Sequence, residues 1–209
     1  MAEASGLIDS IGEWVLRNAC RQAARELPGL CIAVNVSPAQ FLRPDFLDSV
    51  SNALATAGLE PGRLEVEVTE SLFMGEVPIA LNNLHGLRKL GVRVALDDFG
   101  TGYSSLAYLS TLPIDSLKID GSFVRGMSEA PQNVEIVRAV LNLGRSLGKK
   151  VIAEGIETVE QLATLQAMGV HVGQGYLLSR PLRAAQVPAL LGEPVQAPPQ
   201  VGALLQQVP

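Results

Sequence analysis

The chain has 209 residues, of which 47% are hydrophobic and 18% are charged, so it can build a sizeable core and is not a disordered protein. Its 16 basic and 21 acidic residues give a net charge of -5, which argues against general binding to DNA or to anionic membranes. No apolar run is as long as a membrane-spanning helix and the N-terminus lacks the pattern of a secretory signal, so we expect a cytoplasmic protein with no membrane segment.

Apolar periodicity predicts short strands that alternate with helices. In chain order, the predicted elements are a helix at 7–27, a strand at 31–36, a helix at 44–57, a strand at 64–68, a helix at 76–90, a strand at 92–96, a short helix at 105–109, a strand at 117–119, a helix at 132–147, a strand at 151–153, a helix at 159–168, a strand at 172–176 and a helix at 184–191. Residues 1–192 are expected to form one domain, and 193–209 a disordered tail rich in Pro and Gln.

The tryptophan, the two cysteines and the two histidines are expected to have structural or incidental roles rather than functional ones. Trp14 lies at helical spacing with apolar neighbours and is expected in the core. Two cysteines, Cys20 and Cys31, are too few for a disulfide framework and are expected to be buried thiols. His85 and His171 are expected to be incidental.

Strand–helix alternation predicts an α/β fold with a parallel sheet. A complete eightfold βα barrel needs about 250 residues. The six predicted strands recur about every 28 residues, so two further units would reach that size. We therefore expect a TIM-type barrel that is incomplete in this chain, with six of its eight strands.

Polar residues follow each predicted strand, at the end where α/β proteins build their active sites. They are Asn35, Glu67, Glu70, Asp97, Asp98, Lys118, Asp120, Glu154, Glu157 and Gln174. The alternative is a solvated rim. Strand alternation places Glu65, Arg93 and Lys150 one layer lower in the barrel. We expect these residues to form an ion-pair network in which Glu65 lies close to Arg93. The alternative is that the three lie in solvent at the open bottom of the barrel.

Several converging carboxylates repel one another, by roughly 4 kcal/mol for two charges 4 Å apart at an effective dielectric of 20. One lysine cannot neutralise Glu67, Asp97, Asp98 and Glu154, whereas divalent cations can. Because the candidate ligands are all oxygens, Mg²⁺ or Mn²⁺ is favoured over zinc. Such ions suit a phosphate ester as substrate.

The segment DDFGTGYSSL, residues 97–106, follows the acidic pair directly. Its glycines and small hydroxyl residues are typical of a mobile active-site loop, with a plain glycine turn as the alternative. The loop residues are Asp97, Asp98, Phe99, Gly100, Thr101, Gly102, Tyr103, Ser104 and Ser105.

Six segments, in this order, resemble the EAL-domain family of bacterial cyclic-di-GMP phosphodiesterases. They are VNVS (34–37), EVTES (67–71), DDFGTGYSSL (97–106), LKID (117–120), AEGIET (153–158) and GQGY (173–176). The resemblance implies a TIM-type barrel whose first strand is antiparallel, and hydrolysis of cyclic-di-GMP to pGpG with Mg²⁺ or Mn²⁺, two ions in a complete site.

The resemblance also implies roles for individual residues. Lys118 matches the lysine near the attacking water, Glu70 the glutamate that anchors the 97–106 loop, and Glu157 a glutamate near the metals. That loop couples dimerisation to metal binding in the family, so a homodimer is expected. The residues that match metal-binding positions are Asn35, Glu67, Asp97, Asp98, Glu154 and Gln174, of which Glu154 is also counted as catalytic with Lys118 and Glu70.

The chain departs from the family in one respect. The tripeptide Glu-Ala-Leu does not occur in it, and the family's first metal-ligand glutamate belongs to that motif. We therefore expect impaired hydrolysis. Whether this chain is an active enzyme stays open at this point. The alternatives are an inactive module that binds cyclic-di-GMP and a protein-interaction module; attached sensory domains are expected in a full-length parent.

Overall fold

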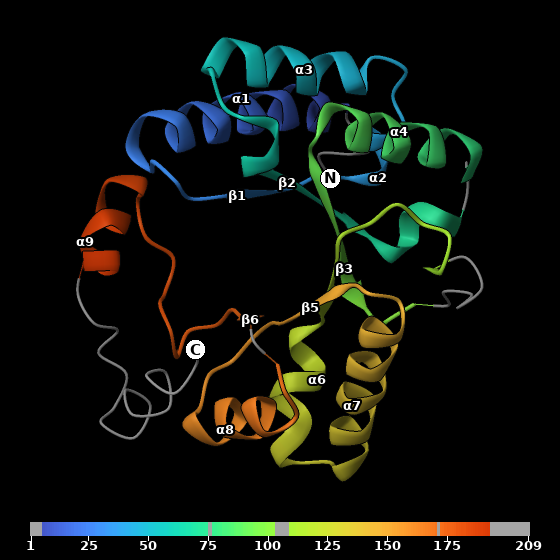
Figure 1. The fold of residues 1–209 in the computed structure, drawn as a ribbon, viewed down its shortest axis with the longest axis vertical. Helices are drawn as coiled ribbons and strands as arrows, with labels where there is room; N and C mark the ends of the chain where they lie inside the picture. The colour runs from blue at the N-terminus through green and yellow to red at the C-terminus, as the bar shows by residue number, and fades with distance from the viewer. Residues whose placement is uncertain (1–5, 75–76, 103–108, 171, 193–209) are drawn as a thin grey trace. The chain divides into compact units, whose positions relative to one another are not determined.

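The computed structural model describes residues 6–74, 77–102, 109–170 and 172–192. The chain divides into two compact units, Met1–Asp115 and Ser116–Pro209. Within each unit, parallel strands alternate with helices along the chain (Figure 1).

The first unit contains three parallel strands that lie in chain order, β1–β2–β3. Helix α1 packs against α3, and α3 against α4, along one side of β1 and β2 (Figure 1). The elements are α1 (Leu7–Glu26), β1 (Ile32–Asn35), α2 (Pro38–Phe41), α3 (Phe46–Ala57), the 3-10 helix η1 (Pro61–Arg63), β2 (Leu64–Thr69), the 3-10 helix η2 (Glu70–Met74), α4 (Val77–Leu90) and β3 (Arg93–Phe99).

One face of the strands of the first unit is apolar and buried, and it carries Val34, Leu64, Val66, Val68, Val94 and Leu96. Val66 and Val94 lie side by side in the register, and neither is exposed to solvent. Side chains at alternate positions point to the same face of a strand, so these residues form one apolar face. Beside them, the rings of Phe41 and Phe46 pack with their centroids 4.8 Å apart.

The Arg63 guanidinium fastens the end of α1 to the start of β2. It donates from Nε to the Leu30 carbonyl (2.7 Å) and from Nη2 to the carbonyls of Ala23 (2.7 Å) and Leu27 (2.6 Å). The last carbonyls of a helix have no partner within the helix, so a cation at this point satisfies them and favours the negative end of the helix dipole.

The second unit contains three parallel strands in the order β4–β5–β6. Its helix α8 begins with a capping box, in which Thr158 accepts from the Gln161 backbone and Gln161 accepts from the Thr158 backbone. The elements are β4 (Ser116–Ile119), α6 (Gly121–Arg125), the 3-10 helix η3 (Gly126–Ser128), α7 (Pro131–Ser146), β5 (Lys150–Ala153), α8 (Val159–Ala167), β6 (Val172–Gly173), the 3-10 helix η4 (Ala184–Gln186) and α9 (Val187–Gly192).

All six predicted strands are present among the described residues, and the long helices begin and end within two residues of prediction. The short helices α2 and α6 escaped prediction because four or five residues are too few to show a 3.6-residue period. The last strand is shorter than predicted and ends at Gly173. The predicted tail at 193–209, His171 and most of the predicted helix at 105–109 lie outside the described residues.

Two burial predictions are wrong. Trp14 is 63% exposed, because α1 buries the row of Leu16, Cys20 and Ala23, and Trp14 lies roughly 200° around the helix from Leu16. Cys20 is buried as predicted, but Cys31 is exposed. Cys31 lies just before β1, on the face of the chain that Ala33 and Asn35 continue, and both of these are exposed as well.

Candidate active site

The carboxyl ends of β1, β2 and β3 bring three of the predicted ligands together. The register pairs Asn35 with Glu67 and Thr69 with Asp97, so Asn35, Glu67 and Asp97 share one face of the strands. Glu67 is 6% exposed and Asp97 is 8% exposed. Buried carboxylates need strong polar partners, and these two share Asn35.

The Asn35 amide lies between the two carboxylates. In the amide orientation that satisfies its neighbours, Nδ2 donates to Asp97 Oδ2 at 3.1 Å and to Glu67 Oε2 at 3.2 Å. A half-turn of the amide exchanges this donor for the amide oxygen. The same three side chains then present three oxygens to one point, which is the ligand chemistry that Mg²⁺ and Mn²⁺ prefer. The donor set therefore fits a hard divalent cation.

The lower layer follows the same register. Glu65 is aligned with Arg93, which confirms that these residues are neighbours on adjacent strands. They lie one alternation before Glu67 and Ala95, so they share the face of the acidic cluster but sit deeper along the strands. Lys150, the third residue of the expected network, belongs to the second unit.

Asp98 follows the cluster in an uncommon backbone conformation. Its φ of 54° is left-handed, and its N–H donates to Asp97 Oδ1 at 3.0 Å. The Asp98 carbonyl accepts from the Thr101 hydroxyl at 2.9 Å. Aspartate tolerates this conformation better than most residues do, and it turns the chain sharply out of β3.

Glu70 ties the following loop to the end of β2. Its carboxylate is buried, and Oε2 accepts from the Gly102 N–H at 3.0 Å. A charge-assisted hydrogen bond across 32 residues fixes this part of the loop. Within the predicted loop, Tyr103, Ser104 and Ser105 lie outside the described residues.

In the second unit, Lys118 of β4 forms an ion pair with Glu154, which follows β5. Lys118 Nζ lies 2.6 Å from Glu154 Oε1, and the two side chains are 4% and 18% exposed. Removing two charges from water costs several kcal/mol per ion unless they are paired well. The two opposite charges therefore neutralise each other in a largely buried position.

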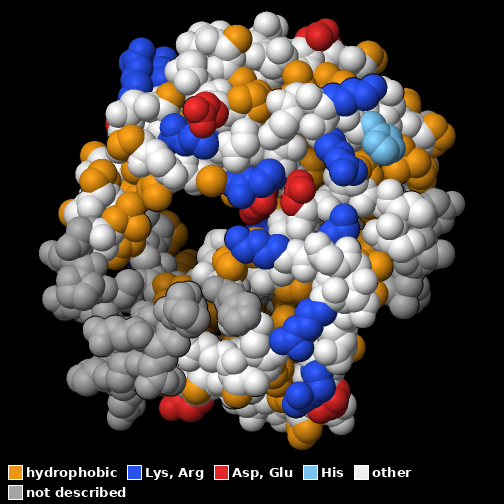
Figure 2. All heavy atoms as spheres, viewed as in Figure 1, with side chains coloured by type: hydrophobic (Ala, Val, Ile, Leu, Met, Phe, Trp, Pro, Cys, Tyr) orange, Lys and Arg blue, Asp and Glu red, His pale blue; other side chains and the backbone are white. Residues whose placement is uncertain are grey.

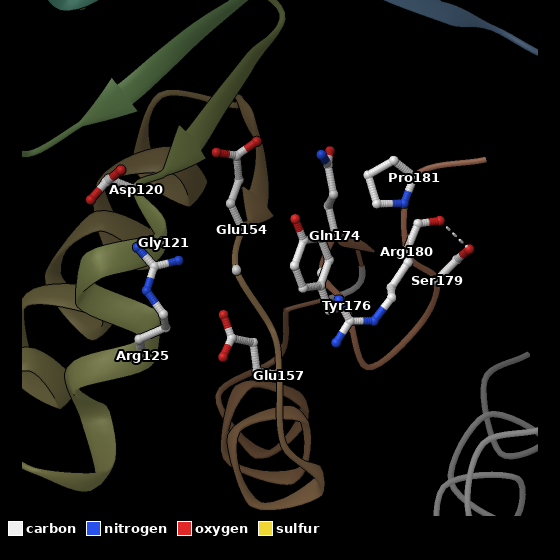
Figure 3. A pocket seen from close by; sticks show the side chains of 12 residues that line it. Asp120, Gly121, Arg125, Glu154, Glu157, Gln174, Tyr176, Ser179, Arg180 and Pro181 are labelled. Atoms are coloured by element: carbon white, nitrogen blue, oxygen red, sulfur yellow. Dashed lines mark hydrogen bonds between the residues drawn. The ribbon is translucent and has the colours of Figure 1, made fainter. Parts of the chain in front are cut away.

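Glu154 also borders a pocket of about 610 Å³ within the second unit. Figure 3 shows Glu154 and Gln174 on one side of it, with Arg125 and Glu157 nearer its base. The Arg180 guanidinium lies 4.9 Å from the centre of the Tyr176 ring, a cation–π contact. The full lining is Asp120, Gly121, Arg125, Glu154, Gly155, Glu157, Gln174, Gly175, Tyr176, Ser179, Arg180 and Pro181.

Arg125, Tyr176 and Arg180 are among the lining residues that were not predicted as site residues. Arg125 ends the short helix α6, whose N-cap is Asp120, and that helix left no periodic signal. Tyr176 and Arg180 follow the last strand, where spacing alone gives no reason to place them together. Asp120 itself accepts from the Ser122 N–H at 2.9 Å, so its carboxylate caps α6.

Comparison with known proteins explains this arrangement. The family model described as "EAL domain" matches residues 1–181. The chain belongs to the EAL-domain family. This EAL domain is 46% identical over 191 residues to the bifunctional diguanylate cyclase/cyclic di-GMP phosphodiesterase MucR of Pseudomonas aeruginosa, covering 90% of the chain and 28% of that protein.

Solved structures show the same fold. The MucR phosphodiesterase in complex with c-di-GMP superposes with a TM-score of 0.86 at 46% identity, covering 89% of this chain and 77% of that one. The BlrP1 protein of Klebsiella pneumoniae, in complex with manganese and c-di-GMP, superposes with a TM-score of 0.76 at 33% identity, covering 82% and 44%. These similarities confirm the predicted α/β fold class of the TIM type.

Two further findings concern the length of the relatives and the search for membrane-spanning helices. The chain spans about a quarter of the length of the first curated relatives that it matches. Among the residues that the structure describes, no helix is both long enough and apolar enough to cross a membrane. On the face drawn in Figure 2, basic and acidic side chains are interspersed with neutral ones.

Proposed function

We propose that this EAL domain, residues 1–192, hydrolyses cyclic-di-GMP to linear pGpG with divalent cations. The observation that carries the proposal is the convergence of Asn35, Glu67 and Asp97 at the strand ends, in a chain similar to a phosphodiesterase solved with c-di-GMP. In the reaction, a water oxygen bonds to one phosphorus while the bond from that phosphorus to a ribose 3′ oxygen breaks. The leaving oxygen takes up a proton.

The proposed cation ligands are those that the resemblance to the family implies: Asn35, Glu67, Asp97, Asp98, Glu154 and Gln174. All of them offer oxygen, which supports Mg²⁺ or Mn²⁺, as two ions in a complete site. When bound, the ions supply positive charge to the phosphate and lower the pKa of the attacking water. The side chains themselves hold that charge at the strand ends.

Lys118 is proposed to orient the attacking water as an ammonium or, after losing its own proton, to accept a proton from that water. Its pairing with Glu154 holds Nζ in one position, which reduces the entropy lost on reaching the reactive geometry. Arg125 and Arg180 bring positive charge to the pocket, where guanidinium groups suit phosphate oxygens. Glu157, at the same pocket, is proposed to support the metal ligands.

Glu70 is proposed to link the 97–106 loop to the cluster, because the same loop carries Asp97 and Asp98 at one end and the Gly102 contact at the other. Dimerisation through this loop, attached sensory domains and a cytoplasmic location stay predictions. So does the expected impairment of catalysis.

The test is product analysis by chromatography after incubating the 209-residue chain with cyclic-di-GMP, with Mn²⁺, with Mg²⁺ and with a chelator. We expect pGpG only with metal, and none from Asp97→Asn. The matched control, Glu135→Gln, alters a 71% exposed carboxylate on α7 and is expected to keep activity. Binding of cyclic-di-GMP without any product would instead identify a binding module. A folded sample that shows no binding and no product would contradict the proposal.

A further inference from the structure

A shallow groove lies on the outer surface of the first unit, between α1 and α3, away from the strand ends. Its volume is about 200 Å³. We call it the α1 groove, and it is lined by Trp14, Arg17, Asn18, Arg21, Ala53, Thr56 and Ala57. The packing of α1 against α3 that forms it is visible in Figure 1.

The α1 groove exposes a large apolar side chain that the fold does not use. Trp14 is 63% exposed, and it continues a row with Leu7 and Ile11, which are 57% and 46% exposed. The three recur at i, i+4 and i+7, so they form one stripe along the first half of α1. Tryptophan and arginine together are the residues most enriched at protein-binding hot spots.

The second half of α1 is basic. Arg17, Arg21 and Arg25 recur every four residues, although the chain as a whole has a net charge of -5. Arg17 pairs with Glu13 at 3.7 Å, with both side chains well exposed, and Arg21 donates to Asn18. Exposed pairs of this kind contribute little, so a competing carboxylate displaces them readily.

The opposite wall of the α1 groove is neutral and small. It comes from α3, with Ala53 and Ala57 one helical turn apart and Thr56 between them. Small side chains let another helix approach closely. A groove between two helices is also the usual seat for an amphipathic helix.

Charge decides which helix fits. A second copy in parallel register would bring arginines against arginines. We propose that the α1 groove binds an amphipathic, acidic helix of a partner protein. Its aliphatic side chains pack on Trp14, Thr56 and Ala57, and its carboxylates pair with Arg17 and Arg21.

The experiment uses Trp14 as the reporter, because it is the one tryptophan of the chain. The probe is a synthetic helical peptide with leucines on one face and glutamates beside them, and the comparison peptide has lysine at each glutamate position. We expect saturable binding of the acidic peptide with a blue shift of Trp14 emission. The double variant Arg17→Glu/Arg21→Glu is expected to bind about tenfold more weakly or worse. The control Arg88→Glu, on the exposed side of α4, is expected to bind as the wild type does.

Four results would overturn the proposal. They are the absence of a Trp14 shift with the acidic peptide, equal binding of the lysine peptide, equal binding by the double variant, and a Trp14 shift that depends on protein concentration without peptide. The last would mean that a second copy fills the groove. A Trp14 shift with phosphatidylserine vesicles but not with the peptide would assign the groove to a membrane surface and would also contradict it. Hydrolysis of cyclic-di-GMP is measured separately, so failure of this inference leaves the proposed function standing.

Discussion

The two units differ in the charged side chains that lie at the carboxyl ends of their parallel strands. At the strand ends of the first unit, Asn35 bridges the buried carboxylates of Glu67 and Asp97. In the second unit, Glu154 is paired with Lys118, and arginines border the open pocket beside it. The first edge gathers oxygens that suit a cation, whereas the second mixes carboxylates with the basic groups of Lys118, Arg125 and Arg180.

This difference indicates that the fold of a βα unit determines where a functional site lies, whereas the side chains at the strand ends determine the charge of that site. Both edges are built from parallel strands whose ends meet. Bound cations and basic side chains both bring positive charge to phosphate oxygens. The comparison therefore predicts that changes in the two units affect different measurements.

The largest expected effect belongs to Lys118. Lys118→Met is expected to lower turnover at saturating Mn²⁺ by about 10²–10⁴-fold, the usual contribution of a positioned proton-transfer group. Mn²⁺ affinity is expected to change little, because the oxygen cluster of the first unit is intact. Initial rates of pGpG formation measure this, with Lys89→Met, on exposed α4, as the control. Turnover within a few-fold of the wild type would remove the second unit's ion pair from the mechanism.

The second-largest effect is expected at Arg63, which holds the end of α1 in the first unit. Arg63→Ala removes the donors for three main-chain carbonyls and is expected to lower the free energy of unfolding by about 3 kcal/mol. Urea unfolding followed by Trp14 fluorescence reports on this unit directly. The control is Arg88→Ala, at an exposed position. An unchanged midpoint for Arg63→Ala would show that the end of α1 is held by packing alone.

In the second unit, the close contact of Gly175 with the backbone of Ile156 is expected to contribute to stability. A Cβ on Gly175 would overlap backbone atoms of Ile156, so Gly175→Ala must shift the chain that lines the pocket. We expect a loss of about 1–3 kcal/mol of stability, as for other overpacked sites. Gly62→Ala is the matched control, since its Cβ would meet nothing nearer than 3.9 Å. Thermal unfolding distinguishes the two variants, and equal melting temperatures would contradict the expectation.

The smallest effect concerns the two cysteines of the first unit. Burial raises the pKa of the Cys20 thiol to about 11, whereas Cys31 is exposed. At pH 8 we expect one thiol to react rapidly with Ellman's reagent and the second only after unfolding. Because the folded pKa is raised, the stability from the neutral Cys20 thiol is present below its unfolded pKa and is lost as pH rises through about 11. Cys31→Ser should abolish the rapid phase, and a rapid phase that survives would contradict the burial of Cys20.

The sequence predicted the strands and long helices well because their apolar periods are long and unbroken. It also predicted the candidate ligands, since polar residues that end buried strands have few structural reasons to be there. It failed for Trp14, because a helix with apolar residues on two faces does not reveal which face the neighbouring helix covers. It missed Arg125 and Arg180, because surface arginines look alike until the fold brings them to one pocket.

The most direct test of the account is the binding of Mn²⁺, followed by the loss of the free-ion signal in electron paramagnetic resonance. The account predicts saturable binding to the wild type and to Lys118→Met. Binding to Asp97→Asn is expected to be weaker by about tenfold or more, since even the partners of metal ligands contribute that much. Equal Mn²⁺ affinity in Asp97→Asn and the wild type, or no binding to either, would contradict the claim that the first unit's oxygen cluster holds the cation.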